Sequence, residues 1–150
     1  MLIRNYDLRR GACRLAGFIG SVSFGLTALS ASAAEYERGY ALFQQHCAAC
    51  HSHIADVWDK SGPNLNGLFG RRAGSADYIH GFSDAMKGSN LTWELGSLMA
   101  FITSPAGVVR GTNMVFRGLE DAGQRSDLLC YLRQATAPNK TRMPGDCDDL

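Results

Sequence analysis

Strand patterns, repeats and proline are all scarce in this sequence. No alternation of apolar and polar residues is long enough to build a sheet, and no internal repeat or low-complexity tract is visible. Proline accounts for only 4 of the 150 residues, whereas glycine accounts for 17. With 45% hydrophobic residues, the composition is that of a folded chain. These features predict a single all-α domain whose helices are joined by glycine-bearing loops.

Residues 1–33 are typical of a cleavable secretory signal peptide. A basic start precedes an uncharged run at 15–29, and Ala31-Ser32-Ala33 fits the small-residue rule for signal peptidase. The uncharged run is too short and too rich in glycine and serine for a comfortable membrane span, so an uncleaved anchor is the alternative rather than the main expectation. Cleavage after residue 33 leaves a domain at 34–138 and a C-terminal tail at 139–150.

The mature chain also lacks an excess of positive charge. The signal segment removes four arginines and Asp7, so Lys plus Arg falls from 15 to 11 and Asp plus Glu from 14 to 13. The formal net charge therefore changes from +1 to −2. Nucleic acid is excluded as a partner, because its recognition relies on many basic side chains.

Two segments carry long helical patterns. In residues 36–50, aromatic residues and then both nearby cysteines follow one another at spacings of three and four, which is one helical stripe. Residues 92–103 carry a second apolar stripe. The stretch that follows, 105–118, begins with proline and has no helical period. We expect that stretch to be a loop.

Two capping signals predict further helices. Asp121 with Gln124 resembles a capping box, and it opens a third main helix that runs through about Ala135. Ser83 can cap a short helix at 84–88.

The stretch HCAACH raises three possible chemistries: a zinc site, thiol–disulfide exchange, or haem attachment. Cys47 and Cys50 with His51 form C-x-x-C-H, the c-type haem attachment motif. Two thiols one helical turn apart can bond to both vinyl groups of one haem, and the adjacent histidine can coordinate its iron. A zinc site would need a second ligand pair, but Cys130 and Cys147 are far apart. A thioredoxin-type motif would need a preceding strand.

A haem iron needs a sixth ligand or an open site. Methionine closes the iron to other ligands and raises its potential, as an electron carrier requires. Met86 and Met99 lie in predicted helices, where core packing explains them, and Met143 lies in the tail. Met114 lies in the helix-free loop, but a lone loop methionine does not by itself indicate a ligand.

Residues 37–136 resemble class I c-type cytochromes, and among them the mitochondrial-type soluble electron carriers. The likeness covers nearly the whole predicted domain, and its landmarks are spaced as the family spaces them. These landmarks are GPNLNGLFGRRAG at 62–74, TW at 92–93, GTNMVF at 111–116 and DLLCYL at 127–132.

This resemblance implies a cytochrome c fold, with three main helices, short helices and loops around one haem c. Cys47 and Cys50 would hold the haem covalently, and His51 would be the proximal iron ligand. Pro63 would accept a hydrogen bond from the other ring nitrogen of His51. Met114 would be the distal ligand.

The resemblance also implies polar groups for a haem propionate. Arg71 and Trp93 would neutralise or hydrogen-bond the propionate, with Thr112 nearby. A solvated surface charge is the alternative for Arg71, since Arg72 beside it has an equal claim by residue type. Trp93 would pack in the core in either case.

One family contact is kept, and several features depart from the family. Gly39 and Phe43 would pack the first helix against the third, as in the family. Phe82 and Phe101 stand where mitochondrial members carry tyrosines, and one extra residue lies between Gly74 and Phe82. Most positions of the family's docking lysines hold other residues.

We expect a soluble one-electron carrier in the bacterial periplasm, working as a monomer and not as an enzyme. Its partners would be redox proteins, such as a membrane oxidoreductase or a terminal oxidase or reductase. Two alternatives are a haem subunit tethered to a larger dehydrogenase or oxidase complex, and an enzyme with an open iron site.

The remaining histidines and cysteines have other expected roles. His46 and His53 flank the motif and would face solvent or the rim of the haem pocket, and His80 is also not expected to be a ligand. Cys130 and Cys147 would form a disulfide that pins the tail, the alternative being two unpaired thiols.

Overall fold

The computed structural model describes residues 27–58, 60–138 and 147. Within them the chain is helical and has no strand, apart from a single bridge between Arg72 and Thr92. The all-α prediction is therefore confirmed. The predicted signal segment falls mostly outside the described residues, and so does the tail except for Cys147. The helices are α1 (Thr27–His46), α2 (Asp84–Gly88), α3 (Leu95–Thr103), α4 (Pro105–Val108) and α5 (Ala122–Ala135).

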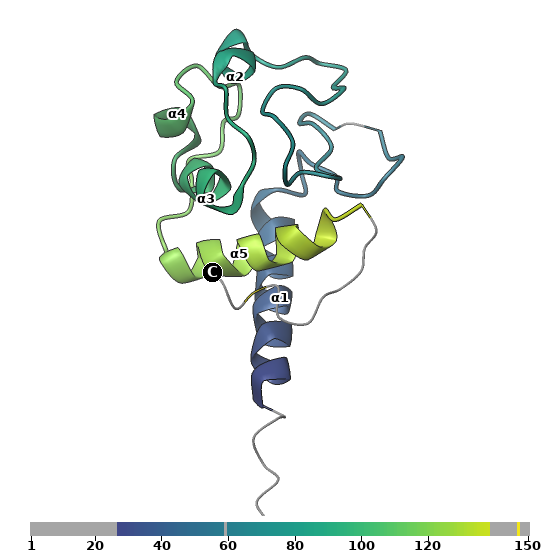
Figure 1. The fold of residues 1–150 in the computed structure, drawn as a ribbon, viewed down its shortest axis with the longest axis vertical. Coiled ribbons are helices and arrows are strands. Elements are labelled where there is room, and N and C mark those ends of the chain that lie inside the picture. Colours follow the sequence, from purple (N-terminus) through teal and green to yellow (C-terminus); the bar gives the residue numbers. More distant parts are fainter. Residues whose placement is uncertain (1–26, 59, 139–146, 148–150) are drawn as a thin grey trace, which may run out of the picture.

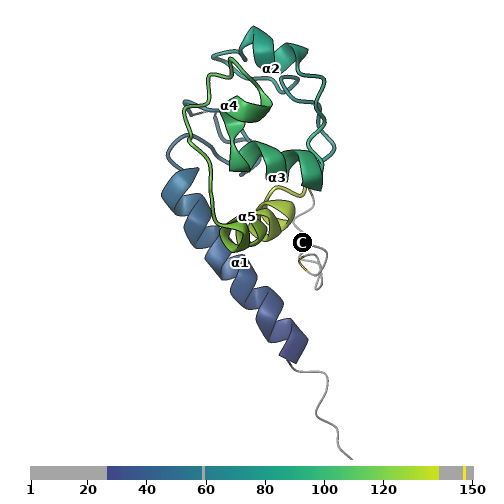
Figure 2. The ribbon, with the colours of Figure 1, turned by 90° about the vertical axis from the view of Figure 1, so that its left-hand side faces the viewer.

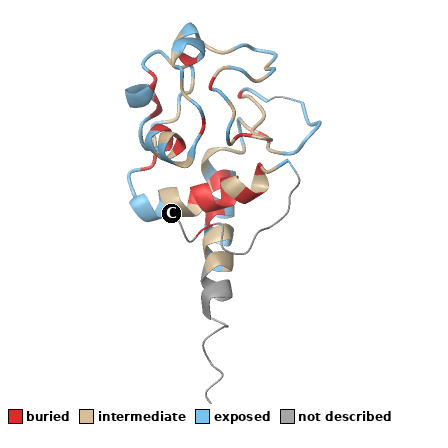
Figure 3. Ribbon diagram, viewed as in Figure 1, coloured by how far each residue is buried: buried red, intermediate tan, exposed pale blue. Residues whose placement is uncertain are grey.

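The fold is organised around the crossing of α1 and α5. In Figure 1, α5 lies across the middle of the long α1, and the loops and short helices gather above the crossing. Figure 2, turned by 90°, shows α3 on the other side of α5. Burial is deepest along the middle of α5, where Leu128, Leu129 and Tyr131 are almost fully enclosed (Figure 3). No helix in the described part of the chain has both the length and the apolar run needed to cross a membrane.

Close backbone approach at the crossing depends on Gly39. A Cβ atom at this position would lie 2.0 Å from the carbonyl oxygen of Asp127 on α5. One turn further along α1, the ring of Phe43 packs 5.3 Å from that of Tyr131. Arg38 adds two hydrogen bonds of 2.7 Å to the Asp127 carboxylate. The predicted packing of Gly39 and Phe43 against the last helix is therefore confirmed.

His53 is half-buried against this crossing and does not line the pocket, so the expectation that it faces the pocket rim was wrong. Its ring lies edge-on to Phe43 at 5.0 Å, and its Nε2 atom is 2.9 Å from the Tyr131 hydroxyl. Burial raises the pKa of Tyr131 well above its usual range. The hydroxyl therefore stays protonated and uncharged beside the His53 ring.

Both capping signals function as predicted. The Ser83 hydroxyl accepts a hydrogen bond from the Met86 amide at 3.1 Å and begins α2. The Asp121 carboxylate accepts one from the Gln124 amide at 2.8 Å and begins α5. Side-chain caps of this kind satisfy amide groups that a helix start leaves without partners.

Several element boundaries differ from the prediction. The first helix begins at Thr27, within the predicted signal segment, rather than at Tyr36, and α3 begins at Leu95 rather than at Thr92. The first helix ends at His46, before the cysteines rather than beyond them. A four-residue helix, α4, lies inside the predicted loop and has Pro105 in its first turn. Proline fits there because its fixed φ suits a helix and its missing amide would have no helical partner. The helix is too short to show an apolar period.

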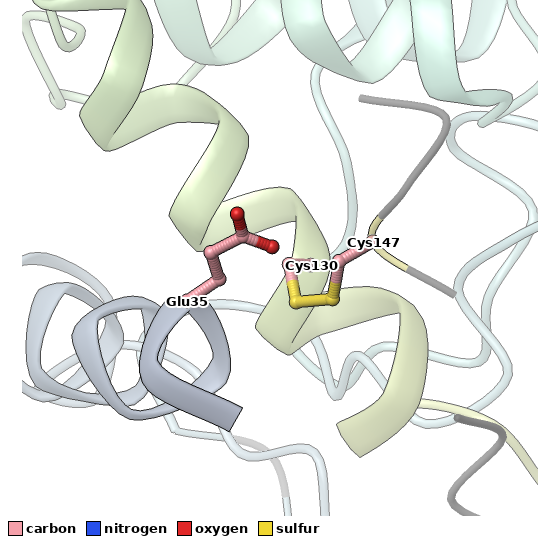
Figure 4. Close-up of side chains that lie close together, drawn as sticks. All are labelled: Glu35, Cys130 and Cys147. Atoms are coloured by element: carbon pink, nitrogen blue, oxygen red, sulfur yellow. A yellow bond between two sulfur atoms is a disulfide. The ribbon is translucent and has the colours of Figure 1, made fainter. Parts of the chain in front are cut away.

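The predicted bond between Cys130 and Cys147 is present in the structure. Both cysteines are buried, and the side-chain amide nitrogen of Gln134 lies 3.4 Å from the Cys147 sulfur. Glu35 of α1 points its carboxylate toward the bond (Figure 4). The disulfide therefore fixes one residue of the tail against α5, close to α1.

Replacing Gly39 with alanine should destabilise the protein, because the new methyl group would meet the Asp127 carbonyl. We expect the free energy of unfolding in urea to fall by about 1–3 kcal/mol, as for other overpacked sites. Gly96→Ala is the matched control, since this glycine of α3 has open space around its Cβ position. That variant should be neutral or gain up to about 1 kcal/mol from helix propensity. Equal stability of the two variants would contradict the close backbone approach of α1 and α5 at Gly39.

Candidate functional site

One cavity of about 590 Å³ lies above the helix crossing, within the size range of small-molecule and cofactor sites. It contains the side chains that sequence reasoning selected, although they come from five separate stretches of the chain. All eight predicted site residues line it: Cys47, Cys50, His51, Pro63, Arg71, Trp93, Thr112 and Met114.

The two cysteines of the motif lie in a turn that follows α1. The Phe43 carbonyl accepts hydrogen bonds from the amides of both Cys47 and Ala48, so the helix widens and ends. The amides of Cys50 and His51 then bond back to the Cys47 carbonyl at 3.0 and 2.8 Å. This turn brings both free thiols to the cavity.

The protonation of Cys47 does not fit thiol–disulfide exchange. Burial, and then the neighbouring Cys50, raise the pKa of the Cys47 thiol to about 11. Reactive C-x-x-C cysteines have a lowered pKa, because the thiolate is the nucleophile. Cys47 is protonated at neutral pH in this conformation and lacks that activation.

The His51 ring is held with one nitrogen free. Its Nδ1–H donates to the Pro63 carbonyl at 2.8 Å, as predicted. Burial lowers the pKa of His51, while the bond to Pro63 acts in the opposite direction and Lys60 lowers it further. The ring is therefore neutral at physiological pH, with its proton on Nδ1 and its Nε2 lone pair available to coordinate a metal.

Sequence reasoning missed the role of Gly62 beside this ring. A Cβ atom at Gly62 would lie 2.5 Å from Cε1 of His51, and the Gly62 amide donates to the Cys50 carbonyl at 2.8 Å. Only a residue without a side chain allows the backbone this close to the imidazole. The signal was present as the glycine that precedes Pro63, but its contact depends on folding.

The two neighbouring arginines are held differently. The Arg71 guanidinium donates to the backbone carbonyls of Asn64 and Asn66, at 3.0 Å each, and is half-buried. Arg72 is exposed and donates to the Asn90 side chain at 2.8 Å. Both line the cavity, and no aspartate or glutamate is among the described residues that do so. The cavity is thus suited to carboxylates of a bound group.

Trp93 is tied to the same wall. Its amide donates to the Arg71 carbonyl at 2.9 Å, and its carbonyl accepts from the Gly70 amide at 3.0 Å. The indole is buried, with its ring 4.9 Å from that of Phe101. Backbone bonding therefore places Trp93 and Arg71 side by side.

Two methionines reach the cavity. Met114 is half-buried, and its amide donates to the Thr112 hydroxyl at 3.2 Å, which shapes the loop around it. Met86, expected to be only a core residue, is buried in α2 and also lines the cavity. Met99 packs on the core but is not among the lining residues. The structure thus retains Met114 as a candidate ligand and adds Met86 as a competitor.

Other residues at the cavity were not selected from the sequence. Tyr78 and His80 line it from the segment that holds the extra residue, and His46 lies at the cavity as the rim prediction allowed. Away from it, the described residues include one cluster of three residues whose types can ligate metals, formed by Glu35, Cys130 and Cys147 (Figure 4). Its sulfurs are joined to each other, so they offer no thiolate to an ion.

These features fit haem c. Two free thiols, a neutral imidazole with one nitrogen available, apolar walls and cationic side chains converge on one cavity. The Cytochrome c family model matches residues 36–136. The chain belongs to the cytochrome c family.

Relatives named cytochrome c align over most of their length. That of Chlamydomonas reinhardtii is 40% identical over 111 residues, which cover 74% of this chain and 98% of the relative. That of Guizotia abyssinica is 40% identical over 108 residues, covering 71% and 96%. That of Theileria annulata is 40% identical over 100 residues, covering 67% and 85%.

Membership of the family establishes the general function. As a cytochrome c, the chain binds haem c covalently through cysteine and is a monohaem electron carrier that acts with redox partner proteins. The zinc and thiol-exchange interpretations of HCAACH are therefore set aside.

Proposed function

We propose that the protein is an exported one-electron carrier whose haem is attached through Cys47 and Cys50 and whose iron is ligated by His51 and Met114. The main support is the convergence of all eight predicted residues on one cavity, with the His51 Nδ1 proton already committed to Pro63. When bound, haem c supplies an iron atom that exchanges a single electron between ferrous and ferric states.

The protein's own residues would attach the haem, orient its histidine ligand and shield the cavity from water. The Cys47 and Cys50 thiols hold the group in a small domain, and the Pro63 carbonyl fixes the tautomer and direction of His51. Arg71 is anchored by two backbone carbonyls, so its charge is pre-positioned for a propionate, with Trp93 and Thr112 as further polar groups. Apolar side chains such as Leu98 and Phe101 complete the walls and exclude water.

A methionine at the sixth position separates a carrier from an open-site enzyme. Met114 would close the iron to peroxide or a gas and would raise its potential relative to other ligands. Met114 is preferred over Met86 because it lies in a loop shaped by Thr112, whereas Met86 is embedded in a capped helix.

Replacing Met114 with alanine should abolish the weak far-red absorption band that reports a sulfur–iron bond in the ferric protein. The reduced variant should bind carbon monoxide readily, because the sixth position opens. Optical spectra of the oxidised, reduced and carbon monoxide-treated holoprotein provide the measurement.

Met86→Leu is the matched control for this experiment, since it removes the other sulfur at the cavity while keeping an apolar side chain of similar volume. The band should survive in that variant. Its loss in Met86→Leu, together with survival in Met114→Ala, would reverse the ligand assignment.

Export rests on the signal-like first 33 residues and is consistent with the Cys130–Cys147 disulfide, which suits an oxidising compartment such as a bacterial periplasm. The purified holoprotein should begin at Ala34 and should gain no mass on alkylation without a reductant. Two alkyl groups should add after reduction, because the other two cysteines are thioethers. A mass that includes residues 1–33 would instead favour the tethered-subunit alternative.

The partner is expected to be a membrane oxidoreductase or a terminal oxidase or reductase, which the protein reaches as a monomer. The usual lysine ring is mostly absent and the mature charge is −2, so long-range steering should be weak. Electron exchange with a membrane fraction of the source cells should slow less than about tenfold between low and physiological ionic strength. A steeper dependence, or no exchange, would contradict this partner assignment.

A further inference from the structure

Tyr78 connects two separate walls of the cavity. Its hydroxyl donates to the carbonyl oxygen of Ser61, 17 residues earlier, at 2.6 Å. Its ring contacts two aromatic neighbours, with the ring centroids 5.5 Å from His80 and 5.2 Å from Phe82. Among the described residues that line the cavity, Tyr78 is the only tyrosine. The two ring contacts therefore restrict the position of the Tyr78 ring, and with it the position of the hydroxyl that bonds to Ser61.

The acceptor belongs to the short segment that supports His51. Ser61 precedes Gly62, whose backbone touches the imidazole, and Gly62 precedes Pro63, whose carbonyl accepts the Nδ1 proton. The other fixed point of the segment is the hydrogen bond from the Gly62 amide to the Cys50 carbonyl. Because Gly62 has no side chain to separate its backbone from the imidazole, we expect a displacement of this segment to alter the position of the His51 ring or its bond to Pro63.

We propose that Tyr78 is a positioning residue for His51: it holds the Ser61–Pro63 segment in place and thereby maintains the hydrogen bond that orients and polarises the imidazole. The inference rests on the proposed role of His51 as an iron ligand. It does not depend on which methionine, if any, occupies the other side of the iron.

The sign of the effect follows from ligand basicity. A strong Nδ1–H···O=C bond increases electron density on the ring and raises the basicity of its coordinating nitrogen. A more basic ligand favours the ferric over the ferrous state. Loosening the segment weakens this bond, so the reduction potential should rise.

The experiment compares Tyr78→Phe with the parent holoprotein by potentiometric titration. We expect the ferrous state to gain about threefold in its equilibrium with the ferric state, which corresponds to a rise of about 30 mV for one electron. NMR of the reduced protein should show faster solvent exchange of the His51 Nδ1 proton, because the bond to Pro63 opens more often. Tyr40→Phe is the matched control, since this exposed tyrosine of α1 is not among the cavity-lining residues.

A purely structural Tyr78 would give a different result. The denaturation midpoint would fall, while the potential and the exchange rate of the Nδ1 proton would match those of Tyr40→Phe. That outcome, or a fall in potential, overturns the inference. Failure of the proposed function is distinguishable, because the parent ferric protein would then show no paramagnetically shifted His51 signals.

Discussion

The hydrogen bond from His51 to Pro63 is the constraint on which the rest of the site depends. It selects one tautomer, it aims the free nitrogen, and it requires the backbone at Gly62 to pass within van der Waals contact of the ring. The Ser61–Pro63 segment returns to the C-x-x-C-H turn, and there the two thiols and the oriented imidazole line one cavity. That segment is fixed by the hydrogen bond from the Gly62 amide to the Cys50 carbonyl and by the one from the Tyr78 hydroxyl to the Ser61 carbonyl. The Ser61–Pro63 segment behind His51 is thus bonded both to the C-x-x-C-H turn and to Tyr78.

The helix crossing supplies the platform for that turn. Gly39 lets α1 and α5 approach at backbone distance, and the rings of Phe43, Tyr131 and His53 fill the space one turn further on. Phe43 is also the residue whose carbonyl ends α1, by accepting amides from Cys47 and Ala48. Phe43 therefore connects the core to the C-x-x-C-H motif, so the packing of its ring helps to set the positions of the two cysteines.

Much of this could be predicted from the sequence, because the decisive signals were local. Caps at Ser83 and Asp121 involve groups three residues apart, and the C-x-x-C-H motif is contiguous. What could not be predicted depends on contacts between distant segments. The end of α1 before Cys47 requires a shared carbonyl, the place of His53 requires Tyr131, 78 residues away, and the contact of Gly62 with His51 exists only after the loop has folded back. Met86 packs in the core as predicted, but the sequence could not show that this helical methionine also lines the cavity.

The distribution of charge separates cofactor binding from partner recognition. The proposed mature chain would be net negative, yet arginine and histidine are the only ionisable side chains other than cysteine and tyrosine among the described cavity-lining residues. Arg71 lines the cavity, and two backbone carbonyls hold its half-buried guanidinium there. A charge held in this way serves a bound group more than it serves long-range steering of a partner. Close to Met114, by contrast, Val115 is 93% exposed and uncharged. In the proposed carrier, short-range apolar contact beside the cavity would therefore contribute more to recognition of a redox partner than attraction between opposite charges at a distance.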